Sequence, residues 1–226
     1  MKPFVEHWET IYKSRAPDQV SWFQASADVS LALVHQAGIE PSQAILDVGS
    51  GASTFVDGLL ARGYSDITLL DVSEQALGIT RGRLGDTPKV RYIVADVTGW
   101  QPPRTFALWH DRAVFHFLSD DDARACYRRA LGALAPGAHA IIATFALHGP
   151  ERCSGLQVRR YSAATLAAEM SAVLRPIDSR EEVHITPSGV EQPFVYVLFE
   201  RIRSRKSVRS PGTREAGNEH PSGPPA

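Results

Sequence analysis

The chain has 226 residues, with 24 Lys and Arg against 25 Asp and Glu, and a formal net charge of −1. This length suits one α/β domain with a full core. The near-neutral charge gives no general attraction to nucleic acid or to anionic membranes. Because only Cys126 and Cys153 are present and no apolar stretch has the length of a membrane span, we expect a cytoplasmic protein without a disulfide framework or a membrane partner.

The hydrophobic pattern predicts helices and strands that alternate up to about residue 146. Helices are expected over residues 26–37, 53–62, 73–84, 119–134 and 162–173. Strands are expected over residues 43–48, 66–72, 89–97, 105–111, 140–146, 181–185 and 192–202. A start of the type S-x-x-D at Ser119 predicts a capping box for the fourth helix, and "APGAH" is expected to end it.

Alternating strands and helices indicate crossover connections and therefore a mostly parallel sheet. The last two strands are joined by a tight "TPSG" turn, so they pair antiparallel. We predict an α/β fold, a Rossmann-like doubly wound seven-stranded sheet with its last strand antiparallel. Its domain would span residues 26–203, after an N-terminal segment at 1–25 and before a basic tail at 204–226 whose composition favours disorder.

Four predicted strands carry an aspartate at their last or next-to-last residue, namely Asp47, Asp71, Asp96 and Asp111. The carboxyl ends of parallel strands meet at one edge of the sheet, and open parallel sheets bind ligands beyond that edge. We therefore predict a ligand site there. No group of His and Cys residues has metal-ligand spacing, so no metal is expected.

The chain between the first two aspartates indicates the kind of ligand. Gly49 and Gly51 follow Asp47, and glycine lets a backbone approach a ligand closely. Asp71 lies 20 residues after Gly51, a spacing typical of a carboxylate that accepts hydrogen bonds from ribose hydroxyls. A dinucleotide site favours a third glycine where this chain has Thr54, and Asp47 would repel a pyrophosphate. A ligand with an ammonium and a sulfonium suits Asp47 better.

Over residues 40–200 the sequence resembles the class I S-adenosylmethionine-dependent methyltransferases. "ILDVGSG", "LLDVS", "IVADV" and "TFALWHDRAVFHFL" resemble the family's first four motifs, in order. "HWETIY", "APDQVSWFQ" and "HDRAVFHFL" resemble a subgroup of small bacterial methyltransferases, and the layout is distantly similar to eukaryotic enzymes that methylate lysines of translation factors. The chain departs at "GSGAST", where the family usually has Cys or Thr between the glycines and a glycine near residue 53.

The resemblance implies S-adenosylmethionine as the cofactor, with S-adenosylhomocysteine as product, and a role for each matching residue. Asp47 would lie near the methionine ammonium, although it could instead bond the amides of a neighbouring turn. Gly49 and Gly51 would let the loop approach the cofactor. Asp71 would hold the ribose hydroxyls, with Val72 against the adenine.

The third and fourth motifs supply the remaining implied roles. Asp96 would accept a hydrogen bond from the adenine amino group, with Val97 under the ring; a helix-capping role for Asp96 is the alternative. Asp111 would face the methionine moiety or the substrate. Asp111 and His116 are the candidate general bases, although packing against the start of a helix is the favoured interpretation for His116.

The N-terminal segment carries Trp8, Tyr12, Trp22 and Phe23 in a polar, proline-interrupted stretch. Two interpretations compete, a helix packed on the sheet and a lid over the cofactor. We favour the lid, with Tyr12 and Trp22 as its contacts.

Taken together, these features predict methyl transfer from S-adenosylmethionine, most simply to a small molecule because no large insertion is present to dock a protein. A protein lysine is the second candidate acceptor, since an acidic body attracts an ammonium. A non-catalytic nucleotide-binding module and an oxidoreductase are the alternatives from other classes; the incomplete glycine fingerprint and the antiparallel last strand argue against the oxidoreductase. A monomer or weak dimer is expected, and nucleic acid is not favoured as a partner.

Overall fold

The computed structural model describes residues 2–202, so the basic tail at 204–226 lies outside the described residues. The helices are α1 (Lys2–Ser14), α2 (Asp28–Gln36), α3 (Phe55–Ala61), α4 (Glu74–Leu84), α5 (Asp121–Ala130) and α6 (Ala163–Met170). The strands are β1 (Ile45–Val48), β2 (Ile67–Asp71), β3 (Val90–Val94), β4 (Phe106–Arg112), β5 (Leu134–Phe145), β6 (Arg152–Cys153), β7 (Leu156–Gln157), β8 (Leu174–Ile185) and β9 (Glu191–Arg201).

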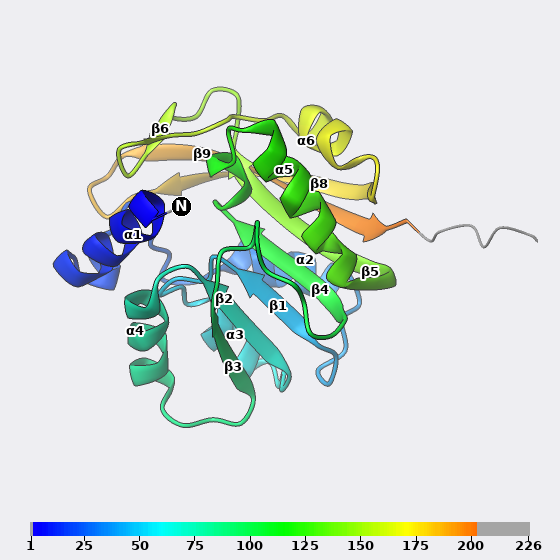
Figure 1. The fold of residues 1–226 in the computed structure, drawn as a ribbon, viewed down its shortest axis with the longest axis horizontal. Helices are drawn as coiled ribbons and strands as arrows, with labels where there is room; N and C mark the ends of the chain where they lie inside the picture. Colours follow the sequence, from blue (N-terminus) through cyan, green and yellow to red (C-terminus); the bar gives the residue numbers. More distant parts are fainter. Residues whose placement is uncertain (1, 203–226) are drawn as a thin grey trace, which may run out of the picture.

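Seven strands form one sheet in the order β3-β2-β1-β4-β5-β9-β8 (Figure 1). Strands β1 to β5 are parallel to their neighbours within that group, and β9 runs antiparallel to both β5 and β8. The predicted Rossmann-like sheet, with its last strand antiparallel, is confirmed. The carboxyl ends of β1, β2, β3 and β4 consequently share one edge.

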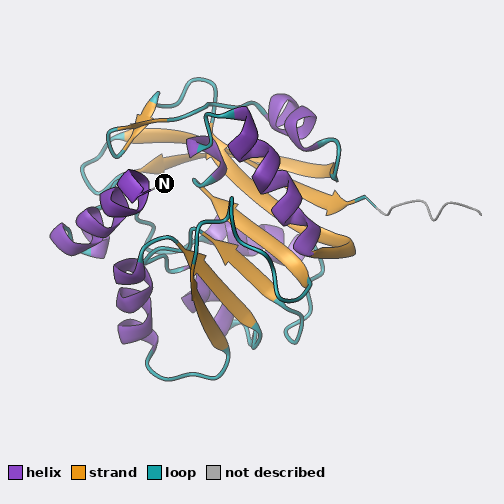
Figure 2. Cartoon of the chain, viewed as in Figure 1, coloured by secondary structure: helices purple, strands orange, loops and turns teal. Residues whose placement is uncertain are grey.

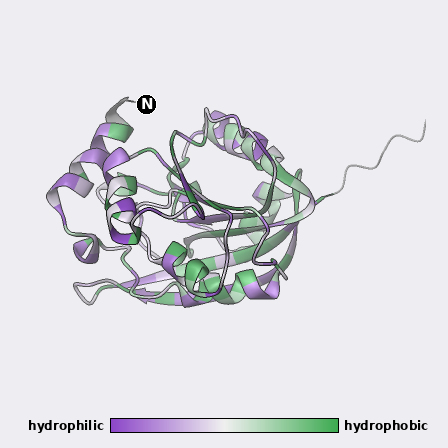
Figure 3. Cartoon of the chain, turned by 90° about the horizontal axis from the view of Figure 1, so that it is seen from below, coloured by the Kyte–Doolittle hydropathy of each residue, from purple (hydrophilic) through white to green (hydrophobic). Residues whose placement is uncertain are grey.

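Helices cover both faces of the sheet (Figure 2). One core cluster contains apolar side chains of α2, α3 and α4, including Leu33, Phe55 and Leu77. The other cluster contains side chains of α5 and α6, including Tyr127 and Leu166. Hydrophobic residues gather on the strands and on the inward sides of the helices (Figure 3). Burial on both faces explains why the parallel strands are continuous apolar runs rather than alternating ones.

Three local predictions were wrong at their boundaries. Helix α5 is capped by Asp120, whose side chain accepts from the backbone N–H of Ala123 at 3.1 Å, so Ser119 is not the cap. "APGAH" does not end that helix; it lies inside β5, which begins at Leu134. β8 begins at Leu174, earlier than expected, because its first residues pair with the end of β9.

The N-terminal segment forms a helix that lies beside α4 rather than on a face of the sheet (Figure 1). Glu9 on α1 accepts a hydrogen bond from the backbone N–H of Gln75 in the first turn of α4, at 3.3 Å. Trp8 and Tyr12 pack in a small apolar cluster with Ala52 and Ala76. This places α1 at the carboxyl edge of the sheet. Within residues 2–202 we find no helix that is both long and apolar enough to cross a membrane.

Candidate active site

A cavity of about 290 Å³ lies at the carboxyl edge of the parallel strands. Its wall takes residues from the ends of β1 to β4, from α1 and from the turn after β4. The lining side chains and backbone belong to Phe4, Trp8, Tyr12, Trp22, Val48, Gly49, Leu70, Asp71, Val72, Ala95, Asp96, Val97, Thr98, Arg112, Ala113, Val114, Phe117, Leu118, Ser119, Asp120, Ala123 and Cys153. The sequence prediction of a site at this edge agrees with this position.

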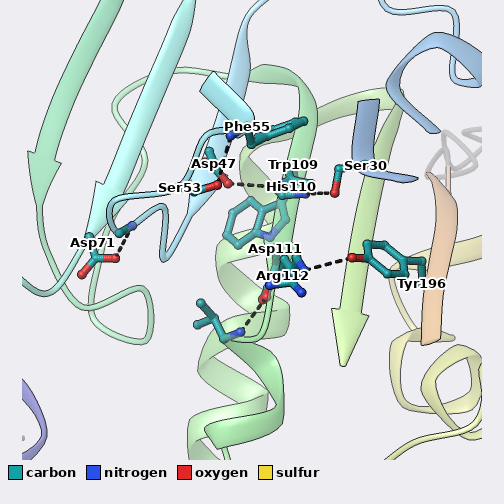
Figure 4. Close-up of polar contacts among 12 residues, drawn as sticks. Ser30, Asp47, Ser53, Phe55, Asp71, Trp109, His110, Asp111, Arg112 and Tyr196 are labelled. Atoms are coloured by element: carbon teal, nitrogen blue, oxygen red, sulfur yellow. Dashed lines mark hydrogen bonds and ion pairs between the residues drawn. The ribbon is translucent and has the colours of Figure 1, made fainter. Parts of the chain in front are cut away.

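Asp71 ends β2 with its carboxylate in the cavity wall, 6% exposed. One oxygen accepts from the backbone N–H of Gly51 at 2.8 Å (Figure 4), and the other accepts from that of Ser73, also at 2.8 Å. Burial raises the pKa of Asp71 to about 6, against the lowering effect of these two N–H groups. Each carboxylate oxygen has two lone pairs, so acceptor capacity remains for hydroxyl donors.

The two glycines of "GSG" are required by contacts within the chain itself. Gly49 and Gly51 have φ of 63° and 51°, a region that side chains rarely adopt. A Cβ at Gly49 would lie 2.0 Å from Val114 Cγ2, and one at Gly51 would lie 2.3 Å from the Tyr12 hydroxyl oxygen. At Gly51 the group that comes close to the loop backbone, and leaves no room for a side chain, is therefore the hydroxyl of Tyr12 on α1.

Tyr12 and Trp22 meet above the glycine loop. Trp22 Nε1 donates to the Tyr12 hydroxyl at 3.3 Å, and the two rings lie edge to face with centroids 6.1 Å apart. Tyr12 is buried, and burial together with the nearby Asp71 carboxylate raises the pKa of Tyr12. Trp8 packs edge to face on both Trp22 and Phe117. The residues predicted for the lid, Tyr12 and Trp22, thus line the cavity.

Asp47 does not line the larger cavity. Its Oδ1 lies 2.7 Å from His110 Nδ1, and His110 Nε2 lies 2.9 Å from the Ser30 hydroxyl (Figure 4). All three side chains are buried, and the His110 ring stacks on Phe55 with centroids 3.9 Å apart. Asp47 and His110 also border a small cavity of about 50 Å³ beneath the N-terminal segment. This chain of hydrogen bonds joins β1, β4 and α2.

Asp111 is completely buried and turned away from the cavity. Its carboxylate accepts from the backbone N–H groups of Val114 and Phe115, at 2.9 and 3.1 Å, and from the Tyr127 hydroxyl at 2.6 Å. Ala113, in the same turn, has φ of 72° and borders the cavity. Burial raises the pKa of Asp111 to about 6. Asp111 therefore holds the shape of the turn that forms part of the cavity wall.

His116 is also fully buried and lies outside the cavity wall. Burial lowers its pKa to about 3, so the ring is neutral near pH 7.

Asp96 does line the cavity, and its Oδ1 accepts from the Thr98 backbone and hydroxyl at 2.8 and 2.7 Å. No helix begins there, so these bonds fix a turn after β3 rather than a helix cap.

The structure therefore divides the predicted site residues into two groups. Those that line the larger cavity are Tyr12, Trp22, Gly49, Asp71, Val72, Asp96 and Val97. Those that lie behind its wall are Asp47, Gly51, Asp111 and His116.

Sequence reasoning missed Arg112, which borders both cavities. Arg112 could have been found from its position directly after Asp111. Successive side chains of a strand point to opposite faces of the sheet, so when Asp111 points away from the cavity Arg112 points the other way. It also missed Ser50, whose buried hydroxyl has no hydrogen-bond partner among residues 2–202.

The chain is similar in sequence to known methyltransferases. Residues 45–137 match the family described as "Methyltransferase domain". A trans-aconitate 2-methyltransferase of Sinorhizobium medicae is 33% identical over 172 residues, which cover 76% of this chain and 54% of that protein. A malonyl-[acyl-carrier protein] O-methyltransferase of Ilyobacter polytropus is 35% identical over 77 residues, which cover 34% of this chain and 29% of that protein. The chain thus spans about half or less of the length of these curated relatives.

The fold also resembles solved structures. A 1,6-didemethyltoxoflavin-N1-methyltransferase of Burkholderia thailandensis, solved with 1,6-didemethyltoxoflavin and S-adenosylhomocysteine, superposes with a TM-score of 0.66 at 20% identity, covering 89% of this chain and 87% of that one. At that identity the likeness shows the fold alone. Sequence and fold together confirm the resemblance to the class I S-adenosylmethionine-dependent methyltransferases.

Proposed function

We propose that this chain, which resembles the class I methyltransferases, transfers a methyl group from S-adenosylmethionine to a small molecule. The observation that carries the proposal is the cavity at the sheet edge, where Asp71, Asp96 and Gly49 share one wall. The names of the relatives support the methyl-transfer reaction, and those of the aconitate and toxoflavin enzymes support a small acceptor.

The residues present fit the proposed cofactor. The cavity of about 290 Å³ is close to the lower end of the range for small-molecule sites. Asp71 keeps free acceptor positions for ribose hydroxyls. Val72 and Val97 provide apolar surface for an adenine ring, and Asp96 provides an acceptor for an exocyclic amine.

The smaller cavity suits the amino-acid end of the same molecule. Asp47 is the acidic group there, and the Ser50 hydroxyl is buried without a partner among the described residues. A buried hydroxyl in that state favours a ligand that completes its hydrogen bonding. Asp47 is already hydrogen-bonded to His110. We therefore assign its negative charge the role of attracting the ammonium of such a ligand, while its bond to His110 is kept.

The sulfonium of the cofactor supplies an electrophilic methyl group, so the protein's task is positioning and exclusion of water. Trp8, Trp22 and Phe117 form an apolar roof that suits this task. Asp111 and His116 point away from the cavity, and we assign both to shaping its wall. An acceptor that carries no proton at neutral pH needs no base.

Two measurements test the proposal. Calorimetry with S-adenosylhomocysteine and with NAD should show binding of the first and not of the second; the reverse would favour the oxidoreductase alternative. Transfer of labelled methyl into a cell extract, fractionated by size, should label the small-molecule fraction. Label in the protein fraction would favour a lysine acceptor, and binding without any transfer would favour a non-catalytic nucleotide-binding module. We retain a cytoplasmic location as part of the proposal, since both cysteines are free.

A further inference from the structure

Arg112 is a half-buried cation in the cavity wall that has no ion-pair partner among residues 2–202. Its Nε donates to the Tyr196 hydroxyl at 2.9 Å (Figure 4), and its Nη1 donates to the backbone carbonyl of Trp22 at 3.1 Å. The guanidinium carbon lies 4.3 Å from the centre of the Phe194 ring. The remaining nitrogen, Nη2, is buried and has no hydrogen-bond partner among the described residues.

The carboxylates that are connected to this region do not neutralise Arg112. Glu182 accepts from the Tyr196 hydroxyl at 2.7 Å and therefore reaches Arg112 only through that hydroxyl. Asp47 is held by His110. Burying a cation without a counterion is unfavourable, and the N–H groups of Nη2, which have no partner among the described residues, suit a carboxylate in charge and in hydrogen bonding.

Arg112 borders both the larger cavity and the smaller one in which we place the amino-acid end of the cofactor, so a carboxylate of the cofactor and one of the acceptor are both within its reach. The aromatic wall beside Arg112 favours the acceptor. The partners of Arg112 come from the N-terminal segment and from β9, not from the strand ends that carry Asp71 and Asp96. β1 lies between β2 and β4, so the ends of the strands carrying Asp71 and Arg112 are about 10 Å apart. The adjoining wall is aromatic, with Trp8, Trp22 and Phe117.

We propose that Arg112 binds a carboxylate of the methyl acceptor, so that the substrate class is small organic acids with an apolar or planar body. This inference rests on the proposed methyltransferase function. Arg112 is then a substrate-binding residue: Tyr196 and Phe194 hold the guanidinium in place, while Nη2 donates to the acid.

The test uses the full chain with S-adenosylhomocysteine bound. Acetate, benzoate, phenylacetate and succinate are titrated beside their amides by calorimetry, on the wild-type chain, Arg112→Gln and Arg112→Lys. At least one acid should bind the wild-type complex more tightly than its amide. Arg112→Gln should weaken binding of that acid by more than about tenfold, and Arg112→Lys should retain part of it. Arg159→Gln is the matched control, because Arg159 also lies over an aromatic ring, that of Tyr161, yet does not line the cavity.

A second arm identifies the source of the carboxylate. Affinity for S-adenosylhomocysteine, and for 5′-methylthioadenosine, which lacks the amino-acid end, should stay within about twofold of wild type in Arg112→Gln, because Arg112 faces the acceptor. A selective loss of S-adenosylhomocysteine affinity would assign Arg112 to the cofactor's own carboxylate and overturn the proposal. So would the absence of any preference for acid over amide in the wild-type chain. Failure of the wild-type chain to bind S-adenosylhomocysteine would instead overturn the proposed function.

Discussion

The hydroxyl oxygen of Tyr12 occupies the space that a side chain at Gly51 would need, 2.3 Å from the position of its Cβ. This contact couples α1 to the loop that follows β1. Gly51→Ala should therefore both strain the loop, by about 1–2 kcal/mol for the left-handed backbone, and displace Tyr12. We expect a lower melting temperature and weaker binding of S-adenosylhomocysteine.

The double variant Gly51→Ala with Tyr12→Phe separates the two effects, since it removes the colliding oxygen and leaves the backbone strain. Binding should recover partly in the double variant. If Tyr12→Phe worsens the defect instead, the contact between the two residues is not the reason for the glycine.

Asp71→Ala should weaken S-adenosylhomocysteine binding by about 1.5–3 kcal/mol, the range for losing hydrogen bonds to a charged group. The structure adds a stability cost, because the backbone N–H groups of Gly51 and Ser73 lose their acceptor. Asp71→Asn should reduce that cost and still lose affinity. Asp66→Ala, just before the other end of β2, is the control and should leave affinity unchanged. An unaltered affinity in Asp71→Ala would show that Asp71 does not bind the ribose.

Asp111 should make the protein less stable as the pH rises from about 4 to about 6. Its folded pKa of about 6 exceeds the ordinary value of 3.8, so the folded state binds more protons within this range. The contribution of protonated Asp111 to the stability of the fold is complete below a pH of 3.8, and it is lost as the pH rises through the folded pKa of about 6. The melting temperature of Asp111→Asn, relative to that of the wild-type chain, should therefore be higher at pH 7 than at pH 5. A difference in melting temperature that is independent of pH would contradict this.

Ser30→Ala should destabilise the fold by about 1–3 kcal/mol, because it leaves the buried His110 Nε2 without a partner. Affinity for S-adenosylhomocysteine should be unaffected, since Ser30 lines neither cavity. Chemical denaturation and calorimetry measure the two quantities separately. Ser26→Ala, on an exposed residue, is the control for stability. A loss of affinity without loss of stability would give this hydrogen-bond chain a functional role.

The N-terminal segment is predicted to be mobile without ligand and ordered with it. Lys13 and Arg15 are exposed, so trypsin should cut there more slowly when S-adenosylhomocysteine is bound, while cutting at the exposed Arg62 stays unchanged. Tryptophan fluorescence should change on binding and change less in Trp22→Phe. Removal of residues 1–24 should abolish activity and leave a folded domain. Equal rates of cutting with and without ligand would identify α1 as a static part of the wall.

The sheet was predictable from sequence because burial on both faces makes its strands plain apolar runs, and because crossover connections, most of them helical, make β1 to β5 parallel. The two ends of α5 and the start of β5 were harder to predict from the sequence. Ser119 and Asp120 are both good capping residues, so local sequence does not decide between them. In β5, Leu134 pairs with Phe106 of β4 and His139 pairs with Leu108, so Pro136 and Gly137 lie in an unpaired irregularity between them, with Gly137 at φ 82°. Their turn signal therefore marks this irregularity rather than the end of α5.

The sequence was sufficient to predict that the candidate site lies at the carboxyl edge of the parallel strands. It was not sufficient to predict the direction in which each side chain points. Four aspartates end four strands, yet Asp111 turns to the amides behind it while Asp71 stays in the cavity wall. A single sequence does not show which way a strand-end carboxylate turns. Arg112 was missed because its importance depends on which acids lie nearby, and its neighbours Trp22 and Tyr196 come from distant parts of the chain.

The two ends of the described chain lie on opposite sides of the sheet, and this has a practical consequence for protein production. Phe4, in the first turn of α1, already lines the cavity, whereas β9 runs antiparallel to β5 and ends at Arg201 at the edge away from the cavity (Figure 1). An affinity tag at the N-terminus would join the chain close to Phe4 and the cavity, where it would compete with ligands for space. The C-terminus follows Arg201 on the other side of the sheet and is the better place for a tag in every binding measurement described above.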